Sequence, residues 1–206
     1  QPGLNIMLTE YSHLFTRDYL LPVGRLREWR SAYQRADVII VSKCPRELNA
    51  EQAASIHEEI QPLSRQQVYF SYYAYSQPYF IFNPGHRLQL EPDMDVLLIC
   101  AIARTDYLTD YLQTQVNEVS IMEYEDHHFF TPYDIARLKE HFDRMDASRK
   151  VILTTEKDAM RLELHRNYLE ENQMPVFAIP VEVCFHFAQG PVFDEQIRRF
   201  LLNFRV

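Results

Sequence analysis

One ten-residue stretch, residues 125–134, combines acidic, imidazole and helix-starting side chains. Its sequence is Glu-Asp-His-His-Phe-Phe-Thr-Pro-Tyr-Asp. An imidazole can accept a proton near neutral pH, and an adjacent carboxylate can fix which ring nitrogen carries the hydrogen. Asp126 and His127 are therefore the candidate acid–base pair. Paired histidines and acids can also be metal ligands, but the other six of the eight histidines are scattered without ligand spacing, so we expect no metal site.

The residues after the histidines predict the start of a helix. Thr131 can cap the helix, Pro132 falls at its first position, and Asp134 lies where a carboxylate can reach back to the cap. Upstream, residues 118–124 are rich in residues that favour strands. We therefore expect His127 in the loop between the carboxyl end of a strand and a helix, which is the edge where ligands bind in open α/β sheets.

A second candidate site lies in residues 20–28, Leu-Leu-Pro-Val-Gly-Arg-Leu-Arg-Glu. Pro22 and Gly24 predict a tight bend, after which Arg25 and Arg27 present guanidinium groups that can bind phosphate with two parallel hydrogen bonds. Two arginines after a turn are also typical of a solvated surface, and the residues alone favour that interpretation.

Two further segments have a buried strand pattern followed by polar residues. In residues 36–45, Lys43 follows the strand and could contact a nucleotide, but we interpret it as an exposed lysine. In residues 151–158, Thr155 can cap a helix whose positive amino end suits the carboxylate of Asp158. Helix capping explains most of this cluster without any function.

Composition indicates a soluble globular protein. The 206 residues are 47% hydrophobic, which is enough for one good core or two small ones. No apolar run approaches the roughly 20 residues that cross a bilayer. The net charge of -8 argues against non-specific nucleic-acid binding. The three cysteines are far apart in apolar stretches without zinc-ligand spacing, which predicts reduced, buried thiols in a cytosolic compartment.

Strand and helix signals alternate along the chain, which is typical of the α/β class with mostly parallel sheets and flanking helices. Strands are predicted at residues 5–9, 37–42, 67–82, 95–102, 118–124, 150–154 and 176–184, and helices at residues 47–60, 105–115, 132–145, 157–171 and 192–203. Prolines interrupt residues 62–95, where no helix is predicted. This segment is interpreted either as a β-ribbon that joins two lobes or as an antiparallel edge pair inside one domain.

Five motifs together resemble one known family. They are, in order, LLPVGRLRE, ADVIIVSKCP, AIAR, EDHHFFTPYDI and ILTTEKDAMRL. The ordered set resembles the carboxyl-terminal two thirds of the tetraacyldisaccharide 4'-kinase family, the lipid A kinases of Gram-negative bacteria. The resemblance implies ATP- and Mg²⁺-dependent phosphorylation of the 4'-hydroxyl of a tetraacyldisaccharide 1-phosphate. It also implies two α/β/α lobes, with residues 1–66 ending the nucleotide-binding lobe, residues 67–94 forming a β-ribbon linker, and residues 95–206 forming the second lobe.

The resemblance also implies roles for particular residues. His127, beside Asp126, matches the family's catalytic histidine. Arg27, and less closely Arg25, match its basic motif at the active-site cleft, where Gly24 would also lie against the substrate. The implied partners are the lipid A disaccharide precursor and the cytoplasmic face of the inner membrane, contacted peripherally through an amino-terminal part. No nucleic-acid partner is implied.

The chain departs from the family in its phosphate-binding residues. A Walker A loop needs a glycine-rich backbone followed by Gly-Lys, whereas this chain has 4 scattered glycines and no Gly-Lys pair. The family's Asp-Asp metal motif is also missing. We therefore expect an amino-terminally truncated fragment that neither binds ATP tightly nor is active alone. The alternative is a non-catalytic α/β binding or interaction domain.

Overall fold

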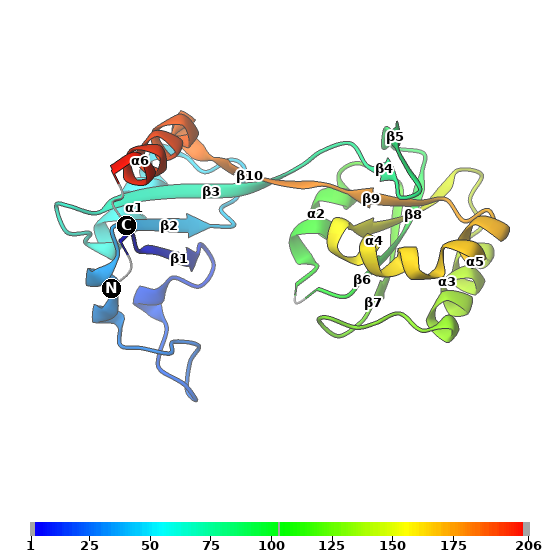
Figure 1. Ribbon diagram of the computed structural model, residues 1–206, viewed down its shortest axis with the longest axis horizontal. Coiled ribbons are helices and arrows are strands. Elements are labelled where there is room, and N and C mark those ends of the chain that lie inside the picture. The colour runs from blue at the N-terminus through cyan, green and yellow to red at the C-terminus, as the bar shows by residue number, and fades with distance from the viewer. Residues whose placement is uncertain (1–2, 103, 204–206) are drawn as a thin grey trace. The chain divides into compact units, whose positions relative to one another are not determined.

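The structure, a computed structural model, describes residues 3–102 and 104–203 (Figure 1). Ala103, in the AIAR motif, therefore lies outside the described residues. The described chain forms two compact units, which divide at residues 74–75 and again at residues 181–182. The first unit thus combines the two ends of the chain, and the second is the continuous segment between them.

The first unit is built on a four-stranded sheet in the order β1-β2-β3-β10. Its elements are β1 (Ile6–Glu10), β2 (Val38–Ser42), α1 (Ala50–Ile60), β3 (Gln67–Tyr75), β10 (Val181–Phe185) and α6 (Gly190–Asn203), with short 3-10 turns at Phe15–Arg17, Arg30–Arg35 and His186–Ala188. Strands β1, β2 and β3 run parallel. Asn49 and Gln52 form a reciprocal capping box that begins α1.

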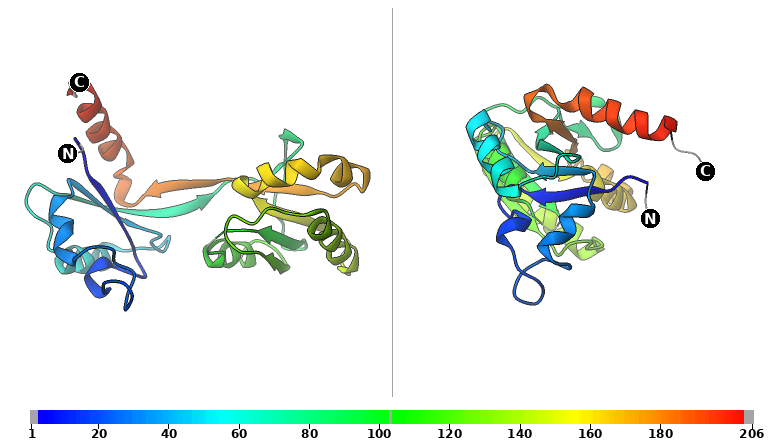
Figure 2. Two further views of the ribbon diagram at one scale, coloured as in Figure 1. Left: turned by 60° about the horizontal axis from the view of Figure 1, so that its bottom comes forward. Right: turned by 90° about the vertical axis from the view of Figure 1, so that its left-hand side faces the viewer.

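Helices cover both faces of this first sheet (Figure 2). Because side chains alternate along a strand, Ile39 and Val41 of β2 pack on one face with residues of α1 such as Ile56. Val38 and Ile40 lie on the other face, in the cluster that Phe193 of α6 packs against. Burial on both faces explains why β2 is a continuous apolar run rather than an alternating pattern.

The second unit has a six-stranded sheet in the order β5-β4-β9-β8-β6-β7. Its elements are β4 (Tyr79–Phe80), β5 (Asn83–Arg87), β6 (Asp95–Cys100), α2 (Asp106–Gln113), β7 (Glu118–Glu123), α3 (Pro132–Arg144), β8 (Lys150–Thr155), α4 (Glu156–Leu162), a 3-10 turn (Glu163–His165), α5 (Arg166–Glu171) and β9 (Val176–Ile179). Strands β9, β8, β6 and β7 are parallel, and the short pair β4–β5 adds an antiparallel edge.

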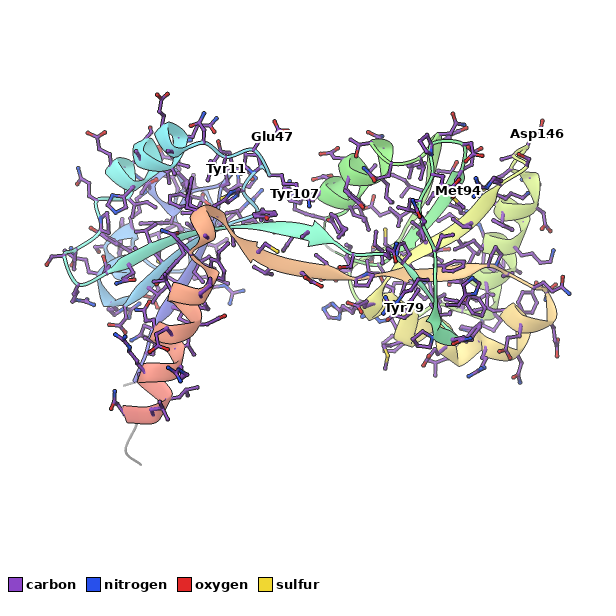
Figure 3. All side chains as sticks on the ribbon, turned by 90° about the horizontal axis from the view of Figure 1, so that it is seen from above. Tyr11, Glu47, Tyr79, Met94, Tyr107 and Asp146 are labelled. Atoms are coloured by element: carbon purple, nitrogen blue, oxygen red, sulfur yellow. The ribbon has the colours of Figure 1, made fainter. Side chains whose placement is uncertain are left out.

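The core of the second unit lies on both sides of β6, whose six residues are all buried. Leu97 and Ile99 pack on the face that α3, α4 and α5 cover. Leu98 packs on the opposite face with Leu108 and Leu112 of α2. Because these strands are parallel, their amino ends lie together along one side of the sheet and their carboxyl ends lie together along the opposite side. Figure 3 shows Asp146, in the segment that leads into β8, and Tyr107, in helix α2 that follows β6, at opposite ends of this unit.

The α/β class with two mostly parallel sheets is confirmed, and most predicted elements agree in position with the structure. Three predicted elements are divided. The strand predicted at residues 67–82 is two strands, β3 and β4, which pair in different sheets. The strand predicted at residues 176–184 is two strands, β9 and β10, which flank Pro180 and pair in different sheets. The helix predicted at residues 157–171 is α4 and α5 with a 3-10 turn between them.

The compact units differ in extent from the domains predicted at residues 1–66, 67–94 and 95–206. The difference arises because β10 pairs with β3 and because the ring of Phe193 packs edge-on against Tyr69. These contacts hold the last strand and helix in the first unit. The predicted linker is likewise shared between the units, with β3 in the first sheet and the β4–β5 pair in the second.

All three cysteines are free thiols. Burial raises the pKa of Cys44 to about 11 and that of Cys100 to about 12. Both thiols therefore stay protonated near neutral pH and behave as apolar core residues. Cys184 is half-buried, in contrast to the burial predicted for it.

Candidate functional site

Three segments meet at the side of the second sheet where its parallel strands have their carboxyl ends, which we call the carboxyl edge. Strands β8, β6 and β7 are parallel neighbours, so the segments that leave their carboxyl ends lie next to one another. Ala101 follows β6, the loop of residues 124–131 follows β7, and helix α4 follows β8 directly. This edge is the position where open α/β sheets bind ligands.

The backbone fixes His127 against the end of β6. The residue has a left-handed conformation, with φ 66°, which is uncommon for a residue other than glycine. Its N–H donates to the carbonyl of Ala101 at 3.2 Å, and the N–H of Tyr124 donates to the carbonyl of Cys100 at 2.9 Å. Two hydrogen bonds to the end of β6 thus hold the loop that contains Asp126 and His127. This loop follows the carboxyl end of strand β7, as the sequence predicted.

The side chain of His127 lies among three charged groups. Its Nε2 atom is 3.6 Å from Oδ2 of Asp126 and 3.4 Å from Nζ of Lys157. Its Nδ1 atom is 3.3 Å from Nη2 of Arg161. The side chain remains 67% exposed, so a ligand can reach the ring from solvent.

The contacts of His127 restrict the hydrogen on its ring. A neutral imidazole has one accepting nitrogen, and ammonium and guanidinium groups only donate. When Arg161 donates to Nδ1, the hydrogen is on Nε2, toward Asp126. When Lys157 donates to Nε2, the hydrogen is on Nδ1. Each cation therefore favours one of the two tautomers, and the ring can present either nitrogen as an acceptor.

Arg161 is the better fixed of the two cations, because Asp158 holds it. Nη1 of Arg161 is 2.8 Å from Oδ1 of Asp158, whose side chain is fully buried, and the arginine side chain is itself 13% exposed. Oδ2 of Asp158 accepts from the N–H of Ala101 at 3.0 Å and from Oγ1 of Thr155 at 2.9 Å. One carboxylate therefore ties together the end of β6, the start of α4 and the guanidinium beside His127.

Helices α3 and α4 begin with the same Thr-x-x-Asp spacing but use the aspartate differently. At α3 the predicted capping box is confirmed, because Oδ2 of Asp134 accepts from the N–H of Thr131 at 2.8 Å. At α4 the predicted cap is also confirmed, with Oγ1 of Thr155 accepting from the N–H of Asp158 at 3.1 Å. The Asp158 carboxylate, however, accepts from the hydroxyl of Thr155 and from the N–H of Ala101 after β6, rather than from the backbone N–H of its own cap residue.

The neighbouring histidine has a structural environment. Nε2 of His128 is 3.0 Å from Oδ2 of Asp134, and its ring stacks on Tyr124 with centroids 4.6 Å apart. Burial alone would raise the pKa of Asp134, but hydrogen bonds from the backbone and hydroxyl of Thr131 and from His128 together lower it to about 2. His128 therefore anchors the loop to α3, while His127 faces α4.

The lowered pKa of Asp134 predicts a pH-dependent contribution to stability. A folded pKa near 2, against 3.8 without these contacts, stabilises the fold by about 2 kcal/mol at pH 7. Because the folded pKa is depressed, this stabilisation is complete above pH 4 and falls as the pH drops toward 2, to about half near pH 3. Asp134→Asn should therefore lower the free energy of unfolding in urea by about 2 kcal/mol at pH 7 and by about half as much at pH 3.

Asp143 provides the control for that measurement. It also lies in α3 but pairs with Lys139 on the surface, so Asp143→Asn should cost less than about 0.5 kcal/mol at either pH. Equal losses for Asp134→Asn at pH 7 and pH 3 would contradict the electrostatic explanation.

The predicted substrate-binding residues Gly24, Arg25 and Arg27 lie in the first unit, so the structure groups them separately from Asp126 and His127. The predicted bend is confirmed, since the N–H groups of residues 23 and 24 both donate to the carbonyl of Leu20 at 3.0 Å. Gly24 is required there, because a Cβ atom would lie 2.2 Å from the carbonyl oxygen of Tyr19.

The side chains of Arg25 and Arg27 are exposed, and within residues 3–102 and 104–203 neither guanidinium has a hydrogen bond or ion pair. Glu28, which directly follows Arg27 in the sequence, forms an ion pair with Arg35 instead. Arg27 lines a surface cavity of about 380 Å³ together with Trp29. Both arginines are thus available to an anionic ligand.

The sequence did not predict roles for Lys157 and Arg161, and it indicated Asp158 only as a carboxylate that suits the positive amino end of a helix. Their signal was spacing, because residues 157, 158 and 161 lie within one turn of a helix that follows a buried strand directly. The interpretation of Lys43 as an exposed lysine is wrong. Its side chain is 18% exposed and forms an ion pair with Glu10 on the neighbouring strand β1.

No three potential metal ligands among His, Cys, Asp and Glu converge within the part of the chain that the structure describes. The charged cluster around His127 contains a single histidine with one nearby acidic partner, Asp126, and two cations. Cations beside the ring would repel a metal ion, so the cluster is suited to proton transfer and to anionic oxygen atoms.

Comparisons with known proteins agree on one family. A family model described as tetraacyldisaccharide-1-P 4'-kinase matches residues 1–202. Among curated proteins described as tetraacyldisaccharide 4'-kinase, that of Bacteroides fragilis strain YCH46 is 36% identical over 95% of this chain and 54% of its own length. That of Porphyromonas gingivalis strain W83 is 35% identical over 94% of this chain and 55% of its own length. The chain thus spans about half the length of these curated relatives.

A solved structure has the same fold. It is described as the "apo" form of LpxK from Aquifex aeolicus in complex with ATP, and it matches with a TM-score of 0.58 at 18% identity. The match covers 97% of this chain and 53% of the other chain. At this identity the likeness concerns the fold alone.

Proposed function

Because this chain belongs to the tetraacyldisaccharide-1-P 4'-kinase family, we propose that it is the carboxyl-terminal part of an ATP-dependent kinase. The enzyme would phosphorylate the 4'-hydroxyl of a tetraacyldisaccharide 1-phosphate, a lipid A precursor. The observation that supports this proposal best is the placement of Asp126 and His127. They form an acid–imidazole pair at the carboxyl edge of a parallel sheet, next to two cations.

Phosphoryl transfer needs a group that takes the proton of the attacking hydroxyl. In the proposed reaction the 4'-oxygen forms a bond to the γ-phosphorus, and the bond from that phosphorus to the bridging oxygen of ATP breaks. The hydroxyl proton passes to the accepting nitrogen of His127, and ADP leaves with the electron pair. Lys157 and Arg161 would attract the anionic oxygens, and Asp126 would orient the ring and stabilise its positive charge.

The phosphate cradle for ATP does not fit the residues of this chain. The chain has no Gly-Lys pair and no glycine-rich loop, and its described residues assemble no metal-ligand group. ATP and Mg²⁺ would therefore be held by the portion of the relatives that this chain does not span. On this proposal, isothermal titration of the isolated chain should detect no saturable binding of Mg-ATP at micromolar concentrations.

The proposal is tested by supplying the missing portion. The amino-terminal part of the Bacteroides fragilis relative, joined to this chain, is called the assembled enzyme below. We expect it to transfer labelled phosphate from ATP to the tetraacyldisaccharide, whereas neither part alone should do so. A folded assembled enzyme that binds ATP without phosphorylating the lipid would instead favour a non-catalytic binding or interaction domain.

Arg27 provides a prediction for the first unit. Its exposed guanidinium could bind a phosphate oxygen pair, a geometry that an ammonium group cannot reproduce. Arg27→Lys in the assembled enzyme should therefore lower kcat/KM by about 10- to 100-fold, the effect of a lost charge-assisted hydrogen bond. Arg35→Lys is the matched control, because Arg35 is also exposed but pairs with Glu28, and it should change kcat/KM less than about twofold. If both variants have the same kinetics, Arg27 is a solvated surface residue that does not bind the substrate.

The substrate class also bears on location. A tetraacylated disaccharide resides in a membrane, so we propose that the protein works at the cytoplasmic face of the inner membrane as a peripheral protein. No helix within the described part of the chain is long and apolar enough to cross a bilayer.

A further inference from the structure

One loop of the first unit, residues 18–30, forms a narrow turn that extends away from the sheet (Figures 1 and 2). The N–H of Leu26 donates to the carbonyl of Tyr19, and the N–H of Leu21 donates to the carbonyl of Leu26, both at 2.9 Å. These two bonds join the two sides of the loop. Residues 21–24 form its tip, and we call the whole segment the 18–30 loop.

The 18–30 loop exposes large apolar side chains. Tyr19, Leu21, Val23 and Trp29 are between 61% and 83% exposed, and Val23 at the tip is the most exposed of them. Single exposed apolar residues are ordinary on a protein surface. Four of them within eleven residues make a concentrated apolar surface, which is typical of a site of association.

The same loop carries unpaired positive charge. Arg25 and Arg27 have no ion-pair partner among the described residues, and the guanidinium of Arg30 lies 5.0 Å from the centre of the Tyr19 ring.

The two acidic side chains of the loop interact with groups other than the side chains of Arg25 and Arg27. Asp18 accepts from the N–H groups of Tyr19 and Arg25, which hold its pKa below the usual value, and Glu28 pairs with Arg35. A cationic loop on a chain of net charge -8 favours an anionic partner.

The order of side chains along the loop fits a lipid surface. The tip has only aliphatic side chains, the aromatic residues Tyr19 and Trp29 lie farther from the tip along the chain, and Arg25 and Arg27 lie between the tip and Trp29 in sequence. Aromatic rings favour the headgroup level of a bilayer, and arginine can keep its charge in the headgroups while its stem contacts apolar surface. Protein interfaces, by contrast, are depleted of charge at their apolar centre.

We propose that the 18–30 loop binds an anionic lipid bilayer, with Leu21 and Val23 inserted at the acyl boundary and Arg25 and Arg27 on lipid phosphates. This assigns membrane contact to a segment of the present chain, whereas the sequence had assigned it to an amino-terminal part. The choice of a bilayer over another apolar, anionic partner rests on the proposed function. Binding to lipid nevertheless requires no phosphoryl transfer, so the two proposals can fail separately.

Trp29 is the single tryptophan of the chain and reports directly on this loop. The 206-residue protein is mixed with vesicles of phosphatidylglycerol and phosphatidylcholine in equal parts, or of phosphatidylcholine alone. We expect a blue shift of tryptophan emission, quenching by brominated acyl chains, and co-sedimentation with the anionic vesicles. Each arginine near the surface strengthens such binding about fivefold, so Arg25→Gln with Arg27→Gln should weaken it about 25-fold.

The tip is tested separately. Leu21→Asp with Val23→Asp should abolish the emission shift and co-sedimentation, while Leu201→Asp with Leu202→Asp, equally exposed on α6, should leave both unchanged. Circular dichroism checks that each variant is folded. If the tip variant does not fold, Val23→Ser replaces it and should still weaken binding.

Three results would overturn the proposal. They are the absence of an emission shift with anionic vesicles, equal binding by the tip and α6 variants, and an emission shift that depends on protein concentration without lipid, which would indicate association of two copies. If vesicle binding fails while the assembled enzyme phosphorylates detergent-dispersed substrate, only the bilayer assignment is lost. If binding succeeds while phosphorylation fails, only the kinase proposal is lost.

Discussion

His127→Ala in the assembled enzyme is expected to lower kcat by about 10²–10⁴-fold, the usual contribution of general acid–base assistance. The ring would take the proton of the 4'-hydroxyl, and alanine offers no replacement. The side chain is 67% exposed and its contacts are at 3.3 Å or longer, so truncation should leave the melting temperature nearly unchanged. ATP binding, which would depend on the other part of the enzyme, should also be unaffected.

His128→Ala is the control for this measurement. Its ring stacks on Tyr124 and contacts Asp134, so its loss should reduce stability while changing kcat much less. Stopped-assay kinetics and thermal unfolding of both variants separate the two roles. The catalytic assignment fails if His127→Ala retains full kcat, or if it loses activity only in proportion to unfolded protein.

The parts of this site that the sequence predicted are those that local chemistry determines. The capping box of α3 involves Thr131 and Asp134, three residues apart, and a proline that suits the first helical turn. Such interactions form within one turn and need no knowledge of the rest of the fold. The same holds for the bend at Gly24, which depends on residues six or fewer positions away.

The parts that the sequence did not predict depend on strand order. Asp158 contacts the N–H of Ala101, which is 57 positions away, because β8 and β6 are neighbours in the sheet. Arg161 reaches His127, 34 positions away, because β7 lies on the other side of β6. Spacing within one segment contains no information about which strands become neighbours. The sequence around α4 therefore predicted a helix cap, but not the hydrogen bond by which the Asp158 carboxylate also holds the end of β6.

Exposure of the 18–30 loop was missed for a related reason. Apolar residues such as Leu21 and Val23 are usually buried, so the sequence directed attention to the arginines alone. Their exposure follows from the turn, in which hydrogen bonds between Tyr19, Leu21 and Leu26 hold the tip away from the sheet. The division of residues 176–184 into β9 and β10 likewise depends on pairing in two different sheets.

Asp158→Ala is expected to lower the free energy of unfolding of the 206-residue chain by about 3–5 kcal/mol, the cost of removing one partner from a buried ion pair. The variant leaves the nearly buried guanidinium of Arg161 without its carboxylate and removes the acceptor of the Ala101 N–H. Arg161→Met, which keeps an apolar stem of similar length, should also destabilise the chain because it leaves the buried carboxylate unpaired. Urea unfolding measures both losses.

The double variant Asp158→Ala with Arg161→Met separates structure from positioning. Because neither charge is left unpaired, its loss of stability should be smaller than the sum of the two single losses by about 1–3 kcal/mol. Turnover should not recover in parallel. The imidazole of His127 would still lack the guanidinium that fixes Nδ1, so kcat of the assembled enzyme should remain on the order of 10- to 100-fold below that of the unmodified protein. Additive stability losses would contradict the buried pair, and full turnover in the stable double variant would show that Arg161 does not position His127.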